Sequence, residues 1–580
     1  MEAGPEMTGA EAIVALLEAE GFEAVFGCCG HGNIGLLDAI AGSRLAFYSF
    51  PNEQLAMHAA DAYFRLTNKM AVVTTTIGPG LGNLLNGFLD AWHDCSSVLV
   101  IAGDTIRAYE GTDSFQEIDV AAQSDIFRLV ANGTVRVRQP EHLLNGIARA
   151  IAFSKAPAPG PALVSVAMDL FSYVGDFDTA GFVGRRPTRP SAVAPEASAL
   201  IAVLDGLAAA ERPAILAGAG ILRSGATADL VRFAERLGAP VVTTMSGQSG
   251  FPNHHPLYAG NTGSVGSPGA VHVLQGADMV VAIGTRFGEL DCCSWLPERF
   301  IPRATRIVQI DINPREIGKA MPVVDGLVAD AGAFLRMAAA GLAEEDGKRA
   351  SWRASLAEVK ARWRAAVSEL AREETVPFTY EPLIADMEAC LPDDAIIAAG
   401  SGIRHHIGQL YRFRQPHTHL VASGNATMGW VTPAVIGAKI ARPDVPVVAL
   451  CGDGDFRSTS EAFGVAAEFG IGAIWIVFNN GGYDIIARYQ RRLYNRAFAS
   501  TFGASEGGRP YSPDYVALAH AYGGKGWSVA SREEFREALR AAMADGGPCL
   551  IEVPVQINMR TEAWGAWEAN RYLRHGWNLA

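Results

Sequence analysis

Short apolar runs rich in β-branched residues alternate with longer amphipathic stretches along most of this chain. Several of these runs end at a glycine or an aspartate, where a helix is then expected to start. The clearest runs lie at residues 71–76, 97–103, 214–218, 279–284, 307–311, 447–450 and 473–478. The alternation predicts an α/β protein built from doubly wound parallel-sheet domains, because buried parallel strands are apolar on both faces.

Two breaks in the alternation divide the 580 residues into three segments of similar size. Residues 178–197 are rich in proline, arginine and serine, as linkers are, and residues 344–375 form a charged stretch typical of a helix between domains. A domain of about 150 residues can bury its own core, so three cores fit this length. The predicted domains are residues 1–180, 190–345 and 375–558, followed by a tail at residues 559–580.

The chain carries 61 acidic and 48 basic side chains, a formal net charge of −13. That balance argues against a nucleic acid or an anionic membrane as partner, because phosphate groups would be repelled. No run of about 20 apolar residues and no basic-then-apolar start is present, so neither a membrane span nor a signal peptide is predicted. The adjacent pairs Cys28–Cys29 and Cys292–Cys293 suit neither a disulfide framework nor a zinc site. We expect a soluble cytoplasmic protein.

The strongest local signal is a pair of polar tips that follow two neighbouring predicted strands. Gly452-Asp453-Gly454 follows the first strand, and Asn479-Asn480 ends the second. Their spacing fits one strand–helix–strand unit, so both tips are expected at the same edge of a sheet. Carboxylate, amide and carbonyl oxygens are hard ligands that suit Mg²⁺, whose other positions are filled by water and substrate phosphates. The sequence therefore predicts a magnesium–diphosphate site.

At these motifs the chain resembles the thiamine diphosphate (ThDP) enzymes, and among them the acetolactate-synthase-like branch, over nearly its whole length. The resemblance implies a pyrimidine-binding domain, a central domain and a diphosphate-binding domain. It also implies that Asp453, Asn480 and the carbonyl group of Gly482 hold Mg²⁺, which carries the diphosphate. The further diphosphate-side residues that it implies are Gly402, Ile403, Gly452, Gly454, Asp455 and Ile485.

Glu53 matches the family's glutamate that forms a hydrogen bond with N1′ of the aminopyrimidine. This role needs a carboxyl group shielded from water, because it favours the tautomer that removes the C2 proton and creates the ylid. The turn from Gly78 to Asn83 matches the family's GPG-x-x-N pattern, so both residues are implied to line the cofactor site. In the segment from Ser423 to Trp430, Met428 would be the wedge that bends the cofactor. The Ala426 carbonyl would bind the 4′-amino group, at a position where the family carries glycine.

The resemblance also indicates residues on the substrate side. The loop from Cys28 to Asn33 replaces the family's FG-x-PGG loop, and its His31 would transfer a proton; the His-Gly-Asn triplet is similar to ThDP hydrolases that open cyclic diketones. Gln116 lies in a segment that matches the border of the synthase pocket. Leu129 and Tyr489 stand where the synthases carry a lysine and a tryptophan, which argues against an ordinary biosynthetic acetolactate synthase. His405 and His406 are either active-site groups or the start of a helix.

The central segment leaves a second cofactor open. Relatives use the elements matching Gly218-Ala219-Gly220, Arg286 and Asp311 to bind FAD or an adenine nucleotide such as ADP. The family's flavin loop, Gly-Met-His-Gly, is replaced here by residues 260–263, so an empty or ADP-binding domain is comparable with a flavin-binding one.

These residues predict a ThDP- and Mg²⁺-dependent lyase or carboligase that acts on a 2-keto acid or 2-hydroxyacyl substrate through a C2 ylid and an enamine. One alternative is a 2-hydroxyacyl-CoA lyase with a lid formed by the tail, which holds Trp564, Trp567 and Trp577. Others are a cyclic 1,2-diketone hydrolase and a catalytically silent nucleotide-binding protein. The family places its active sites between subunits, so a homodimer or homotetramer is expected.

Overall fold

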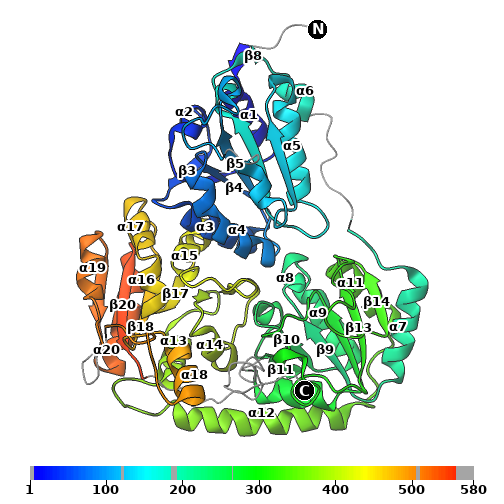
Figure 1. The fold of residues 1–580 in the computed structure, drawn as a ribbon. Coiled ribbons are helices and arrows are strands. Elements are labelled where there is room, and N and C mark those ends of the chain that lie inside the picture. The colour runs from blue at the N-terminus through cyan, green and yellow to red at the C-terminus, as the bar shows by residue number, and fades with distance from the viewer. Residues whose placement is uncertain (1–5, 119–122, 184–191, 264–265, 504–509, 557–580) are drawn as a thin grey trace. The chain divides into compact units, whose positions relative to one another are not determined.

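The computed structural model describes residues 6–118, 123–183, 192–263, 266–503 and 510–556. It contains three six-stranded parallel sheets flanked by helices, which confirms the predicted α/β fold (Figure 1). Each of the seven predicted runs overlaps a strand of these sheets over most of its length. The chain groups into two compact units. The first unit comprises Met1–Pro190, Ala422–Asp444 and Thr459–Ile471, and the second comprises Ser191–Val421, Val445–Ser458 and Gly472–Ala580.

The first unit is built on a sheet with the strand order β3-β2-β4-β5-β7-β6. One face of this sheet packs against α1, α2 and α5 through a continuous apolar core. The alternate residues of the strands point to the opposite face of the sheet, toward α3. On that face the Phe26 ring lies 6.0 Å from the Tyr63 ring of α3. The strands are β2 (Ala24–Gly27), β3 (Ala46–Ser49), β4 (Ala71–Thr75), β5 (Val98–Asp104), β6 (Gly133–Val137) and β7 (Ala162–Ala167); the helices are α1 (Gly9–Ala19), α2 (Ile34–Ala41), α3 (Glu53–Thr67), α4 (Pro79–His93), α5 (Leu143–Ser154) and α6 (Thr179–Val183).

Three further parts belong to the first unit. The short strands β1 (Glu6–Thr8) and β8 (Val174–Asp176) pair in an antiparallel manner. The helices α15 (Val431–Ala441) and α17 (Glu461–Glu468) come from the last third of the chain. α15 packs directly on α3, because Gly437 has no side chain and its Cα faces the backbone of Ala59.

This helix contact predicts a stability effect. A Cβ atom at Gly437 would lie 1.9 Å from the carbonyl oxygen of Ala59, so Gly437→Ala must push α15 away from α3. We expect the free energy of unfolding to fall by about 1–3 kcal/mol, as overpacking of a core does. Gly82→Ala is the matched control, because Gly82 also lies in a helix but a Cβ there meets nothing within 4 Å. It should stabilise the protein by about 0.5–1 kcal/mol. Equal denaturant midpoints for the two variants would contradict the tight contact.

The second unit contains a central sheet with the strand order β11-β10-β9-β12-β13-β14. Its two faces bury separate apolar clusters, one under α7, α9 and α11 and the other under α10 and α12. The charged stretch predicted as a helix is α12 (Ala350–Leu370). The other elements are β9 (Pro213–Ala217), β10 (Val241–Thr243), β11 (Tyr258–Asn261), β12 (Met279–Ile283), β13 (Arg306–Asp311), β14 (Asp325–Val328), α7 (Ala197–Ala209), α8 (Gly220–Arg223), α9 (Thr227–Leu237), α10 (Pro268–Gly276) and α11 (Ala331–Gly341).

The third sheet, also in the second unit, has the strand order β16-β15-β17-β18-β20-β19. Its strands are β15 (Ile396–Ala399), β16 (His419–Val421), β17 (Val447–Gly452), β18 (Ile474–Asn479), β19 (Lys525–Ser528) and β20 (Cys549–Pro554). The helices around it are α13 (Tyr380–Cys390), α14 (Arg404–Leu410), α16 (Asp453–Ser458), α18 (Asp484–Tyr494), α19 (Tyr515–Ala521) and α20 (Arg532–Asp545). Within the described ranges, every helix is too short or too polar to traverse a bilayer.

Candidate functional site

Glu53 begins α3 in the first unit and is buried, with 4% of its surface exposed. The hydroxyl group of Thr75 donates to its Oε1 at 3.3 Å, and the amide of Asn83 donates to its Oε2 at 3.0 Å. Both partners lie at the edge of the sheet where β4 leads into α4. The carboxyl group is therefore shielded from water and fixed by two neutral donors.

The glycines of the turn between β4 and α4 allow this turn to lie close to Glu53 and to Gln116. A Cβ atom at Gly80 would lie 2.7 Å from Oε1 of Glu53, and one at Gly78 would lie 2.4 Å from the carbonyl oxygen of Gln116. Gly78 has a φ of +62°, which favours glycine. The structure thus brings together Glu53, Asn83, Gly78 and Gln116. The buried Oε1 of Gln116 has no hydrogen-bond partner among the described residues.

The loop from Cys28 to Asn33 is held by the side chain of Asn33. Its Nδ2 donates to the carbonyl oxygen of Cys28 at 3.1 Å and to Oγ1 of Thr74 at 3.2 Å, and its Oδ1 accepts from the backbone of Gly30 at 2.9 Å. His31 is exposed, and its ring lies 5.4 Å from the ring of Phe115. Asn33 therefore shapes the loop, and the imidazole of His31 is open to solvent in this chain.

Cys28 is the residue of this loop that sequence reasoning missed. Burial and the neighbouring Glu53 carboxylate raise the pKa of the Cys28 thiol to about 11. The thiol is thus a neutral group beside Glu53. Its position at the end of β2, next to β4 in the sheet, was the available signal, because loops at the same edge of a parallel sheet converge.

The segment from Ser423 to Trp430 lies on α4: a Cβ atom at Gly424 would be 2.4 Å from the Cβ of His93. Ala426 has a φ of +57°, in the left-handed region that glycine adopts freely. This conformation gives a physical reason why glycine suits the position and shows how alanine is accommodated. Met428 is 41% exposed in this chain.

In the second unit, β17 leads directly into Asp453, which is 1% exposed. Its Oδ2 accepts hydrogen bonds from the backbone N–H groups of residues 480, 481 and 482, at 3.2, 2.6 and 3.1 Å. Its Oδ1 accepts one from Gly454 at 2.9 Å. Burial raises the pKa of Asp453 to about 6 against the opposing effect of these four N–H groups. The two polar tips predicted from the sequence therefore meet at one sheet edge.

The donor set at Asp453 and Asn480 fits a hard cation. Oδ1 of Asn480 is buried and has no hydrogen-bond partner among the described residues, and Oδ1 of Asp453 accepts only one. No group of three or more His, Cys, Asp or Glu side chains within the described ranges could hold a metal ion. A cation here would therefore take one carboxylate, one amide oxygen and backbone oxygens, which is the set that Mg²⁺ accepts together with water and phosphate.

The loop after β15 lies beside this edge, because β15 and β17 are parallel neighbours. The carboxylate of Asp455 lies against Gly400, where a Cβ atom would come within 2.4 Å of it. In contrast, a Cβ atom at Gly402 or Gly452 would meet no heavy atom within 4 Å. Both glycines therefore border open space, as a cradle for phosphate oxygens requires. Ile403 is buried in the core at 2% exposure, and Ile485 is half-buried in α18.

His405 and His406 lie in the first turn of α14 and are both buried. The ring of His406 stacks on Tyr380 at 4.1 Å. Burial, with the positive charge of Arg488, lowers the pKa of His406 to about 3, and burial lowers the pKa of His405 well below its usual range. Both side chains are therefore neutral. The structure places them as packed residues of a helix start.

The glycines of the central sheet serve backbone packing. A Cβ atom at Gly218 would lie 2.1 Å from the carbonyl oxygen of Gly284, and one at Gly220 would lie 2.6 Å from the Cα of Gly284. Asp311 is mostly buried and accepts a hydrogen bond from the backbone of Asn313 at 2.8 Å. Burial raises its pKa to about 6. The close backbone contacts with Gly284 account for the glycines at positions 218 and 220 without a bound nucleotide.

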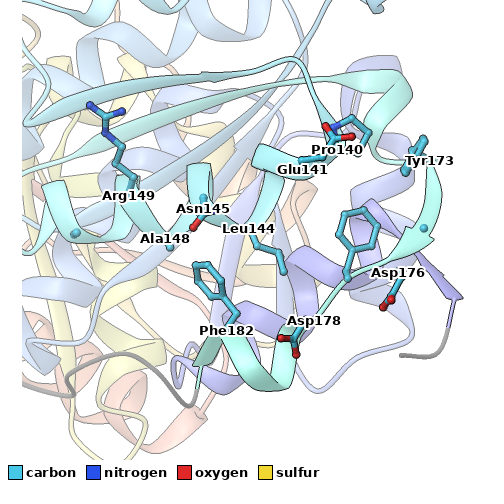
Figure 2. A pocket seen from close by; sticks show the side chains of 13 residues that line it. Pro140, Glu141, Leu144, Asn145, Ala148, Arg149, Tyr173, Asp176, Asp178 and Phe182 are labelled. Atoms are coloured by element: carbon cyan, nitrogen blue, oxygen red, sulfur yellow. The ribbon is translucent and has the colours of Figure 1, made fainter. Parts of the chain in front are cut away.

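A separate cavity of about 770 Å³ opens on the surface of the first unit between α5 and the segment that follows β8 (Figure 2). Leu144 and Phe182 border it, with the acidic Asp176 and Asp178 at its rim. None of the predicted site residues lines this cavity.

Comparison with known proteins gives matches along nearly the whole chain. Three domain families match: the N-terminal TPP binding domain of thiamine pyrophosphate enzymes at residues 7–123, their central domain at residues 200–338, and their C-terminal TPP binding domain at residues 402–553. Thiamine pyrophosphate (TPP) is the same compound as ThDP.

Relatives of full length are similar to this chain. A probable acetolactate synthase large subunit of Methanocaldococcus jannaschii is 30% identical over 95% of this chain and 92% of that protein. A sulfoacetaldehyde acetyltransferase of Rhodobacter capsulatus is 31% identical over 94% of both chains. An acetolactate synthase large subunit of Corynebacterium glutamicum is 32% identical over 93% of this chain and 85% of that protein.

Proposed function

This chain belongs to the thiamine pyrophosphate enzymes, in the acetolactate-synthase-like branch, and from that premise we propose that it forms or breaks a carbon–carbon bond next to a carbonyl group. Its proposed substrate is a 2-keto acid or a 2-hydroxyacyl compound. The observation that carries the proposal is the buried Glu53 carboxyl group held by Thr75 and Asn83. An acid that hands a proton to and from a bound heterocycle must be shielded and fixed in this way.

The residues of the second unit would bind the charged end of the cofactor. Asp453, Asn480 and the carbonyl group of Gly482 would hold Mg²⁺ through oxygen atoms, and Mg²⁺ would carry the diphosphate. The unpartnered Oδ1 of Asn480 supports this role. The remaining contacts to the diphosphate end are proposed for Gly402, Ile403, Gly452, Gly454, Asp455 and Ile485.

The residues of the first unit would bind the pyrimidine ring. Thiamine diphosphate, when bound, would supply a nucleophilic carbon for attack on a carbonyl carbon and a ring that takes up the electron pair of the broken bond. Glu53 would hold a proton on its carboxyl group toward the ring, and Gly78 and Asn83 would line the ring with it. The Ala426 carbonyl oxygen would accept a hydrogen bond from the ring's amino group, and Met428 would pack against the cofactor.

On the substrate side we propose His31 as the proton-transfer group and Gln116 as a pocket residue. The solvent-open imidazole of His31 and the unpartnered Oε1 of Gln116 support these roles.

Tyr489 and Leu129, in place of tryptophan and lysine, favour an activity other than ordinary acetolactate biosynthesis. A cyclic 1,2-diketone hydrolase remains a second candidate through His31, whereas Asn33 is fully engaged in shaping its loop. The tail proposed as a lid for a 2-hydroxyacyl-CoA lyase lies outside the described residues.

Two binding properties complete the proposal. The protein is proposed to be a homodimer or homotetramer with active sites between subunits, which size-exclusion chromatography with light scattering tests. Binding of FAD or ADP by the central domain is a further question, and the absorbance of the purified protein near 450 nm together with mass spectrometry of released small molecules answers it.

The test of the function starts with the cofactor. ThDP is titrated into the purified protein by calorimetry with and without Mg²⁺, and the loaded protein is then assayed with pyruvate, a 2-hydroxyacyl-CoA and a cyclic 1,2-diketone. We expect Mg²⁺-dependent binding and turnover of at least one of these substrates. Failure to bind ThDP in the presence of Mg²⁺ would overturn the proposal and favour a catalytically silent protein.

A further inference from the structure

One face of α4 carries the polar side chains of Asn83, Asn86 and Asp90, and Asp94, the C-cap residue directly after the helix, continues this row at helical spacings of three and four residues. Asn83, near the start of the helix, donates a hydrogen bond to Glu53. We call residues 423–428 the 423–428 loop. The other three side chains all form hydrogen bonds with this loop, in its part from Ser423 to Thr427. A single helix face thus contacts both parts of the first unit that are proposed to meet the pyrimidine ring.

Asp94 links a basic residue of α3 to the start of the 423–428 loop. Its Oδ1 accepts from the hydroxyl group of Ser423 at 2.9 Å, and its Oδ2 accepts from the backbone N–H of Ser423 at 3.3 Å. Oδ2 also accepts from the guanidinium group of Arg65 at 2.6 Å. Arg65 is buried and lies 4.9 Å from the ring of Trp430, just beyond the loop. Both carboxylate oxygens of Asp94 are therefore needed as acceptors.

Asp90 repeats this arrangement one turn earlier on the helix. Its Oδ2 lies 3.0 Å from Nε2 of His58, which is also on α3, and its Oδ1 accepts from the backbone N–H of Thr427 at 3.5 Å. Asp90 and His58 are both fully buried. Asp90 and Asp94 thus each bridge a basic side chain of α3 and the backbone of the loop.

Asn86 holds both neighbours of Ala426. Its Oδ1 accepts from the hydroxyl group of Thr427 at 3.1 Å and from the amide of Asn425 at 3.3 Å. Between these two anchors Ala426 adopts its left-handed φ of +57°, which costs an alanine free energy. A backbone in such a conformation persists only where its surroundings hold it.

We propose that Asn86, Asp90 and Asp94 are positioning residues that hold the 423–428 loop in the conformation that presents Ala426 and Met428 to the pyrimidine ring of the cofactor. This inference rests on the function proposed above. It predicts that loss of these contacts weakens binding of the whole cofactor and leaves the diphosphate site of the second unit intact.

The test compares the binding of two ligands, ThDP and inorganic pyrophosphate. Both are titrated into the full-length protein by calorimetry in the presence of Mg²⁺. Asp94→Asn replaces one carboxylate oxygen by an NH₂ group, which then faces one of the three donors from Ser423 and Arg65. We therefore expect the affinity of this variant for ThDP to fall about tenfold, while its affinity for pyrophosphate changes less than about twofold. Asp104→Asn is the matched control, because Asp104 is a buried acid of the same unit that pairs with Arg136 at 2.7 Å and not with the loop. It should change neither affinity.

A second variant covers the case in which Asp94→Asn does not fold. Asn86→Ala removes a half-buried neutral side chain from a helix, and the same selective loss of ThDP affinity is expected. Unchanged ThDP affinity, an equal loss for both ligands, or an equal loss in Asp104→Asn would overturn the positioning role. Absence of ThDP binding by the unmodified protein would instead refute the proposed function, so the two failures are distinct.

Discussion

Replacing Glu53 by glutamine is expected to slow the exchange of the C2 proton of bound ThDP by at least about 100-fold, the lower end of the range for a lost general acid–base group. The amide fills the same space between Thr75 and Asn83 but cannot pass a proton to and from the ring. We expect the dissociation constant for ThDP to change by less than about tenfold, because one mismatched hydrogen bond costs about 1 kcal/mol. Proton exchange followed by NMR after acid quench measures this effect without knowledge of the physiological substrate.

The matched control is Glu196→Gln, which makes the same chemical change at another helix start. Glu196 caps α7 by accepting from the backbone of Ser198 and Ala199, within the second unit. It should leave the exchange rate at its original value. A Glu53→Gln protein that binds ThDP and exchanges the proton at nearly the original rate would remove Glu53 from the proposed chemistry.

Replacing Asp453 by asparagine is expected to abolish the dependence of ThDP binding on Mg²⁺ and to weaken that binding by roughly 100-fold, the effect of losing about 3 kcal/mol at a charged ligand. The substitution removes the carboxylate that accepts from residues 480–482 and turns one oxygen into a donor that faces N–H groups. Calorimetric titration of ThDP at several Mg²⁺ concentrations measures both effects.

Asp514→Asn is the control for this variant. Asp514 is an acid of the second unit that caps α19 by accepting from Ala517 at 2.8 Å, and asparagine is an equally good cap. Its ThDP affinity should stay Mg²⁺-dependent. If Asp453→Asn kept the same Mg²⁺ dependence as this control, the metal site would have to be sought elsewhere.

Local patterns were sufficient to predict the strands and the two polar tips. The run at residues 447–450 is apolar on both faces and is followed by Gly452 and Asp453, and the structure places it as β17. Asn480 follows the next strand of the same sheet, β18, so the meeting of Asp453 and Asn480 follows from strand order alone. Parallel neighbours end at one edge, and that rule needs no side-chain contact to be known.

The substrate-side loop shows where local patterns stop. The sequence drew attention to His31, the only basic residue in the loop from Cys28 to Asn33, but it did not indicate that the Cys28 thiol lies beside Glu53. The path of the loop depends on the amide of Asn33, which holds Thr74 of a neighbouring strand. Such a bond joins residues far apart in the chain, so the identity of the residues within the loop does not reveal it.

By itself, the sequence determined the fold class and the pair of polar tips after two adjacent strands, because both depend on short-range patterns of apolar and polar residues. The shielded place of Glu53 at a helix start was implied by the resemblance to a known family. Only the tertiary structure decided that α4 carries the contacts of the 423–428 loop. Asp94 and Ser423 lie 329 residues apart, and their hydrogen bond exists because α15 and the loop before it fold onto α3 and α4. The spacing of polar residues on α4 indicates a polar face, but the partner of that face is set by packing between distant segments.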